Sequence, residues 1–76
     1  MKIRINSFGQ LTEVIGKNPI VFEAQTIDEV KEQLHNQFPS LQKLKFALAV
    51  NNRLADGNVK LEEGDIVSLL PPFSGG

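Results

Sequence analysis

The stretch 26-TIDEVKEQLHNQFP-39 predicts one amphipathic helix with a defined start and a defined end. Thr26 is a suitable N-cap, Glu29 completes a capping box three residues later, and Asp28 places negative charge at the positive end of the helix dipole. Pro39 predicts the end of the helix, because the residue before a proline disfavours helical geometry. The apolar residues recur at intervals of three and four and form one stripe that must pack on another element: Ile27, Val30, Leu34 and Phe38.

Three strands are predicted around this helix. Residues 2–8 (KIRINSF) alternate polar and apolar side chains, which is typical of a strand with one buried face. Residues 18–24 (NPIVFEA) are rich in β-branched and aromatic residues, and residues 65–70 (DIVSLL) run directly into two prolines. Between the first two strands, residues 9–16 (GQLTEVIG) predict a short helix.

A hairpin is predicted after the main helix. Residues 45–50 (KFALAV) and 53–55 (RLA) flank Asn51 and Asn52, and asparagine tolerates the left-handed conformation that a tight turn requires. Residues 40–44 (SLQKL) are expected to be a loop between the helix and this hairpin.

The order of these elements predicts an α+β fold in which one main helix packs across one mixed sheet. We expect one domain at residues 1–70 and a flexible C-terminal tail at residues 71–76. The predicted core combines the helix stripe with inward-facing strand residues: Ile3, Ile5, Ile20, Phe22, Leu48, Val50, Val67 and Leu69.

Length and composition restrict the function classes. With 76 residues, 41% of them hydrophobic and 22% charged, the chain is typical of one small globular domain rather than of a disordered segment. The net charge is −1 and the basic residues are scattered, which argues against nucleic-acid binding. The absence of cysteine excludes a disulfide framework and a catalytic thiol. No segment approaches the roughly 18 apolar residues of a membrane span, so we expect no membrane contact and a cytoplasmic location.

The body of the chain offers no recognisable active site. His35 is the only histidine and lies in a polar part of the helix, so we expect it to have no chemical role. Glu62, Glu63 and Asp65 surround Gly64 and are interpreted as a solvated turn rather than as metal ligands. We therefore expect no metal and no bound cofactor in the chain itself.

The remaining distinctive feature is the stretch 71-PPFSGG-76. Its two prolines favour an extended exit from the last strand, and its phenylalanine is a large apolar anchor. A glycine carboxylate without neighbouring Cβ atoms can pass along a narrow channel to ATP, where adenylation converts it into an acyl donor. A frayed end without function is the alternative. The predicted tail residues are Pro71, Pro72, Phe73, Ser74, Gly75 and Gly76.

Two stretches resemble ubiquitin-like β-grasp proteins, most closely the MoaD family of molybdopterin synthase small subunits: the closing EEGDIVSLLPPFSGG (62–76) and the opening FGQLTEVIG (8–16). The resemblance spans the whole chain and implies a sulfur carrier with no active site of its own. By this resemblance, an adenylyltransferase (MoeB-like) uses ATP and Mg²⁺ to adenylate Gly76, and a sulfur donor then converts the glycine to a thiocarboxylate.

The resemblance also implies where the sulfur goes. The tail is expected to insert into the large subunit of molybdopterin synthase (MoaE-like), where the sulfur passes to cyclic pyranopterin monophosphate. Phe8, Leu54 and Leu70 correspond to apolar residues on the sheet surface that meets these partners. The alternative for these three is an ordinary core or edge position.

Two other functions stay open at this point. The chain could carry sulfur for thiamine synthesis (ThiS-like) or for tRNA thiolation, which share the mechanism but differ in the acceptor. It could also be a binding domain or a ubiquitin-like protein modifier that is joined to lysines through Gly76.

Overall fold

The computed structural model describes residues 1–71, so the predictions for Pro72, Phe73, Ser74, Gly75 and Gly76 lie outside the described residues. Within residues 1–71 the strands are β1 (Lys2–Ser7), β2 (Ile20–Glu23), β3 (Ala47–Val50), β4 (Arg53–Leu54) and β5 (Ile66–Leu70). The helical elements are α1 (Leu11–Ile15), α2 (Ile27–Gln37) and the 3-10 helix η1 (Pro39–Lys43).

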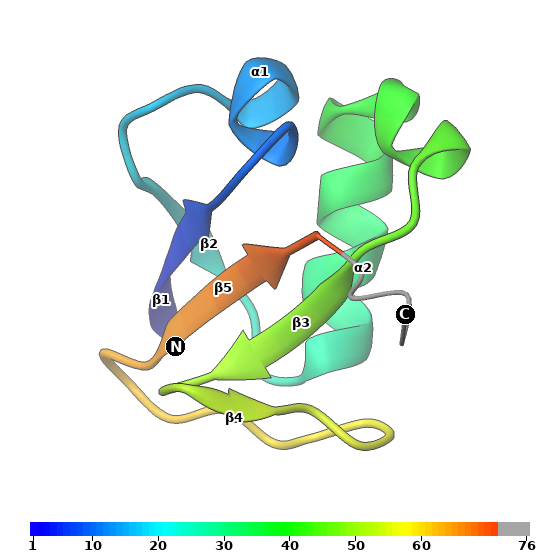
Figure 1. The fold of residues 1–76 in the computed structure, drawn as a ribbon. Coiled ribbons are helices and arrows are strands. Elements are labelled where there is room, and N and C mark those ends of the chain that lie inside the picture. The colour runs from blue at the N-terminus through cyan, green and yellow to red at the C-terminus, as the bar shows by residue number, and fades with distance from the viewer. Residues whose placement is uncertain (72–76) are drawn as a thin grey trace.

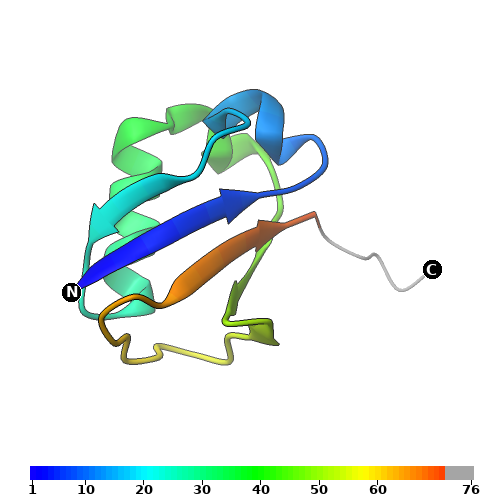
Figure 2. The same cartoon turned by 90° about the vertical axis from the view of Figure 1, so that its left-hand side faces the viewer.

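The strands form one mixed sheet in the order β2-β1-β5-β3-β4. The two central strands, β1 and β5, are parallel, and every other neighbouring pair is antiparallel. Figure 1 shows α2 lying across one face of this sheet, and Figure 2 shows β1 and β5 side by side. This arrangement confirms the predicted α+β fold.

The start of α2 lies where the sequence predicts it. Thr26 Oγ1 accepts a hydrogen bond from the Glu29 backbone N–H at 3.3 Å, so Thr26 is the N-cap. The return bond of the capping box is shifted by one residue, because Glu29 Oε1 accepts from the Gln25 N–H at 2.6 Å. The helix ends at Gln37, two residues before Pro39.

The hairpin prediction is confirmed, and the loop prediction after α2 is wrong in part. Asn51 and Asn52 have φ angles of 49° and 72°, the left-handed pair that a two-residue hairpin turn requires. The expected loop at residues 40–44 is mostly the 3-10 helix η1, which begins at Pro39. A proline is compatible with the first position of a helix, and the turn that follows buries Leu41 to 1% exposure.

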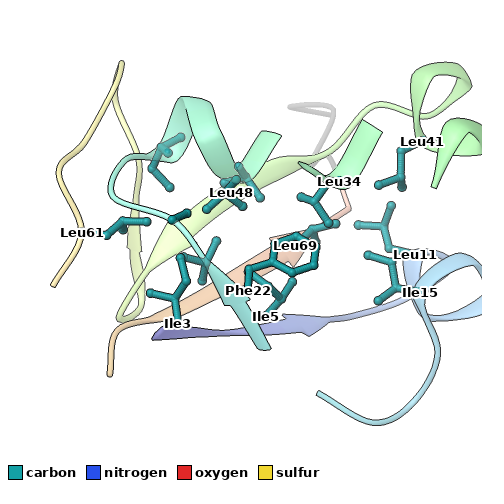
Figure 3. Close-up of a cluster of buried hydrophobic side chains, with 14 residues drawn as sticks. Ile3, Ile5, Leu11, Ile15, Phe22, Leu34, Leu41, Leu48, Leu61 and Leu69 are labelled. Carbon is teal, nitrogen blue, oxygen red and sulfur yellow. The ribbon is translucent and has the colours of Figure 1, made fainter. Parts of the chain in front are cut away.

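The core lies between α2 and the sheet (Figure 3). The predicted core residues are buried, except that Ile20, Phe38 and Val50 are half-buried and pack against the core. The prediction missed further buried residues from short or irregular segments: Leu11, Ile15, Ala24, Leu41 and Leu61.

Candidate functional site

The base of the predicted tail lies at the end of β5, beside the turn that connects β1 to α1. The Phe8 N–H donates to the Leu69 carbonyl at 3.2 Å, which continues the parallel pairing of β1 and β5 one residue beyond the end of β1. The Phe8 carbonyl accepts in turn from the Leu11 N–H at 3.3 Å, at the start of α1. Figure 2 shows α1 directly above the ends of β1 and β5. Pro71 therefore follows a strand end that is hydrogen-bonded to the turn before α1.

Gly9 provides the space for Pro71. Gly9 has a φ of +62°, and a Cβ atom built on it would lie 3.3 Å from Pro71 Cγ, closer than most real Cβ contacts. A side chain at this position would push against the proline ring and would also strain the backbone. The contact gives Gly9 a part in setting the direction in which the chain leaves β5.

Replacing Gly9 by alanine is expected to destabilise the fold and to move Pro71. The left-handed backbone alone costs alanine roughly 1–2 kcal/mol of unfolding free energy, and the contact with Pro71 adds to that cost. Gly57→Ala is the matched control, because Gly57 has a φ of +78° but no atom within 4 Å of the position that a Cβ would occupy. Urea unfolding measures both free energies, and NMR shifts at Leu70 report the displacement. Equal losses and unchanged Leu70 shifts in both variants would show that the Gly9–Pro71 contact has no consequence.

The three residues predicted to meet partners lie on the sheet face opposite α2, which we call the outer face. Val67 and Leu69 of β5 are fully buried beneath α2, so by alternation Leu70 lies on the outer face. Leu70 pairs with Ala47 in β3, and Leu54 pairs with Ala49, two residues further along the same strand. Side chains of paired residues share a face, which places Leu54 on the outer face as well.

Phe8 continues the outer face beyond β1. Ser7 pairs with Leu69, so Phe8 is the next position along and lies beside Leu70. The Phe8 and Leu54 side chains are 49% and 70% exposed, and Leu70 is half-buried. The structure therefore brings the three residues to one solvent-facing surface, and Leu54 sits in the edge strand β4. Their role as a partner interface remains a prediction.

The outer face also carries residues that the sequence analysis did not single out. Arg4 pairs with Val21 on one side and with Ile66 on the other, so these three side chains share the outer face. Val21 is 63% exposed and Ile66 is 37% exposed, and with Lys2 and Arg4 they line a depression of about 330 Å³. The available signal was strand geometry: Val21 and Ile66 precede the buried residues Phe22 and Val67, so their apolar side chains point to the opposite, outer face.

The acidic cluster before β5 has a structural role. Asp65 Oδ1 accepts from the Asn51 side-chain amide at 2.9 Å, and Asp65 Oδ2 accepts from the Glu62 N–H at 2.8 Å. Glu63 accepts from the Lys2 N–H at 2.9 Å. These bonds close the turn around Gly64 and join it to the hairpin and to β1. Among residues 1–71, no group of three or more acidic or histidine side chains is placed to hold a metal ion.

His35 has a contact that the sequence analysis did not anticipate. It is half-buried, and its ring lies 6.3 Å from the ring of Phe46, centroid to centroid, at an interplanar angle of 58°. The side chain thus packs α2 against the segment before β3. Of the helices in the described part of the chain, none is long and apolar enough to cross a bilayer.

The fold is that of a ubiquitin-like β-grasp domain, in which the chain end leaves the sheet from its central parallel pair. Comparison with protein-family models matches residues 5–76 to the ThiS family. The chain therefore belongs to the ThiS family and has the ubiquitin-like fold of the ThiS/MoaD sulfur carriers.

Solved structures support this assignment. The chain is similar to a chain in the complex of subunits 1 and 2 of molybdopterin-converting factor from Helicobacter pylori, with 31% identity, full coverage of both chains and a TM-score of 0.77. A Pyrococcus furiosus protein provisionally assigned as molybdopterin converting factor subunit 1 has 19% identity and a TM-score of 0.83, over 93% of this chain and 97% of that one. SAMP1 from Haloferax volcanii has 21% identity and a TM-score of 0.80 over the full length of both chains.

Proposed function

We propose that this chain is a sulfur carrier for molybdopterin synthesis and acts in the cytoplasm as the non-catalytic small subunit of molybdopterin synthase. The main support is that the family match extends through residue 76 and so includes the Gly75-Gly76 ending. The 31% identity to a chain from a molybdopterin-converting factor complex favours this pathway over others that use the same fold.

In the proposed reaction the chain supplies only the acyl group. A carboxylate oxygen of Gly76 attacks the α-phosphorus of ATP in an adenylyltransferase (MoeB-like) with Mg²⁺, and pyrophosphate leaves. Sulfide supplied by a donor then attacks the carbonyl carbon of the acyl adenylate and AMP leaves, which yields the thiocarboxylate. In the large subunit (MoaE-like) the sulfur passes to cyclic pyranopterin monophosphate, and water provides the oxygen that restores the carboxylate.

The folded body would serve as the surface by which both partners hold the carrier. Phe8, Leu54 and Leu70 present an apolar surface on the outer face, which suits docking of a partner protein. Pro71 starts the tail from a defined position beside Gly9. Counted from Pro71, an extended tail spans at most about 20 Å, so Gly76 can reach a pocket in a partner that is docked on this body.

The proposed function predicts a specific covalent change at Gly76. The purified chain is incubated with the adenylyltransferase, ATP, Mg²⁺ and a sulfide source, and its intact mass is measured. We expect the mass to rise by the difference between one sulfur and one oxygen, and fragmentation to place the change at Gly76. Omission of ATP is the control and should leave the mass unchanged. An unchanged mass in the complete reaction would contradict the proposal.

Sulfur transfer to thiamine synthesis is the second candidate, because the matching family model is the ThiS family. A deletion strain separates the two pathways. Loss of molybdoenzyme activity with normal growth in the absence of thiamine supports the molybdopterin pathway, and the reverse phenotype supports the thiamine pathway. The likeness to SAMP1 lies at 21% identity and concerns the fold, so it favours no modifier function.

A further inference from the structure

A groove lies at the edge of the sheet between α2 and the segment that leads into β3. It has a volume of about 530 Å³. Lys31 and His35 line it from α2, and Lys45 and Phe46 line it from the segment before β3. Leu54 closes the groove from β4. This groove lies at the sheet edge and is distinct from the depression around Arg4 on the outer face.

The backbone of β3 is open along this groove. β4 pairs with β3 only at Ala49 and Val50, and one further bond runs from the Ala55 N–H to the Leu48 carbonyl at 2.8 Å. Alternate residues along a strand direct their backbone groups to opposite neighbours. The Leu48 carbonyl accepts from Ala55 on the β4 side, so the Leu48 N–H faces that edge too. Continued by one step of the alternation beyond the start of β3, the same direction applies to both backbone groups of Phe46. Within residues 1–71 these three groups have no backbone partner. Figure 1 shows β4 beside the C-terminal end of β3 only.

The side chains around this open edge are apolar at the centre and basic at the rim. Phe46 and Leu44 are half-buried, and Leu54 is 70% exposed, so apolar surface is available in the groove. Lys31 and Lys45 are exposed on its two sides. Among the described residues that line the groove there is no aspartate and no glutamate. An occupant with apolar side chains flanked by carboxylates matches this pattern.

We infer that the open edge of β3 binds an extended, acidic and apolar segment of a partner protein, which adds a short strand to the sheet. The backbone of such a segment pairs with Phe46 and Leu48, and its side chains alternate between the α2 side and the outer face. Its apolar residues contact Phe46 on one side and Leu54 on the other. Its carboxylates lie near Lys31 and Lys45. This binding does not use Gly76, Phe8 or Leu70, and Leu54 is the one residue that the groove shares with the surface proposed for the sulfur-transfer partners.

The test is an NMR titration of the ¹⁵N-labelled chain with a synthetic peptide that has four central valine or isoleucine residues and two glutamates at each end. We expect saturable shifts at Phe46, Leu48 and Ala55, and slower hydrogen exchange at the Phe46 and Leu48 amides. A peptide with lysines in place of the glutamates is expected to bind about tenfold more weakly or worse. A peptide with N-methylated central amides is also expected to bind about tenfold more weakly or worse, because its methylated amides cannot donate hydrogen bonds to the backbone of the chain.

Paired charge variants localise the binding. Lys31→Glu with Lys45→Glu should weaken binding of the acidic peptide about tenfold or more. Lys17→Glu with Lys60→Glu makes the same change in net charge at exposed positions outside the groove and should have an effect below about twofold. The inference would be overturned by any of three results. The two double variants could weaken binding equally, the shifts could be confined to β2 or to the outer face, or the peptide could show no saturable binding. The inference would also be overturned if the chain formed concentration-dependent dimers without peptide and the Phe46 and Leu48 shifts changed with concentration. In that case a second copy of the chain would cover the edge of β3.

Discussion

Adding one alanine after Gly76 is expected to abolish sulfur acceptance and to leave the fold unchanged. The reaction requires the carboxylate of Gly76 to reach the α-phosphorus of ATP. The extension converts this carboxylate into a peptide bond, and the new terminal carboxylate belongs to the added alanine, one residue further along. Misplacement of a reacting group by about 1 Å can cost roughly 100-fold in rate, so we expect at least that loss. The measurement is the initial rate of thiocarboxylate formation by intact mass.

The control for this variant carries the same extra alanine at the other end of the chain, before Met1. It should accept sulfur at the normal rate, because Met1 is an exposed residue outside the core. The urea midpoints of both variants should match that of the parent chain, since the core is formed by residues 3–69. Normal sulfur acceptance by the variant extended after Gly76 would contradict the proposed function, and a lost fold would mean that the tail contributes to the core.

Truncating Leu34 to alanine is expected to remove a large part of the free energy of unfolding. Leu34 is fully buried and lies at the centre of the α2 stripe, facing the sheet (Figure 3). Leucine-to-alanine changes in well-packed cores cost about 2–5 kcal/mol, from the lost burial and the cavity that remains. Small domains have little more than roughly 5 kcal/mol of unfolding free energy in total. Thermal unfolding followed by circular dichroism should show the melting temperature fall by more than about 10 °C.

Asn36→Ala is the matched control for Leu34→Ala. Asn36 is exposed on the same helix, and its replacement changes no core contact. The unfolding free energy of this variant should stay within about 0.5 kcal/mol of that of the parent chain. A comparably small effect of Leu34→Ala would show that α2 is not packed on the sheet as described.

Much of the fold could be predicted because its signals are local. Thr26 and Glu29 lie one helical turn apart and define the start of α2 by their own hydrogen bond. Asn51 and Asn52 adopt the left-handed turn that their side chains tolerate. Each of these features depends on a few neighbouring residues, so the amino-acid order is sufficient to predict it.

The prediction failed where a short segment depends on distant neighbours. Residues 40–44 contain two leucines separated by polar residues, a pattern too short to indicate a helix, and the turn of η1 forms as Leu41 enters the core. Leu61 is buried although it lies in no strand or helix. Burial of such isolated side chains is decided by what the rest of the chain places beside them.

The sequence by itself determined the main elements, their order and the Gly-Gly ending on which the proposed chemistry rests, because these follow from local conformational preference and from residue type. Only the tertiary structure brought Phe8, Leu54 and Leu70 to one face, since the strand register decides which positions of neighbouring strands share a face. Only the tertiary structure also revealed the open edge of β3 beside Lys31 and the close approach of Pro71 to Gly9. Contacts of this kind join residues far apart in the chain, and no local pattern encodes which strand will lie next to another.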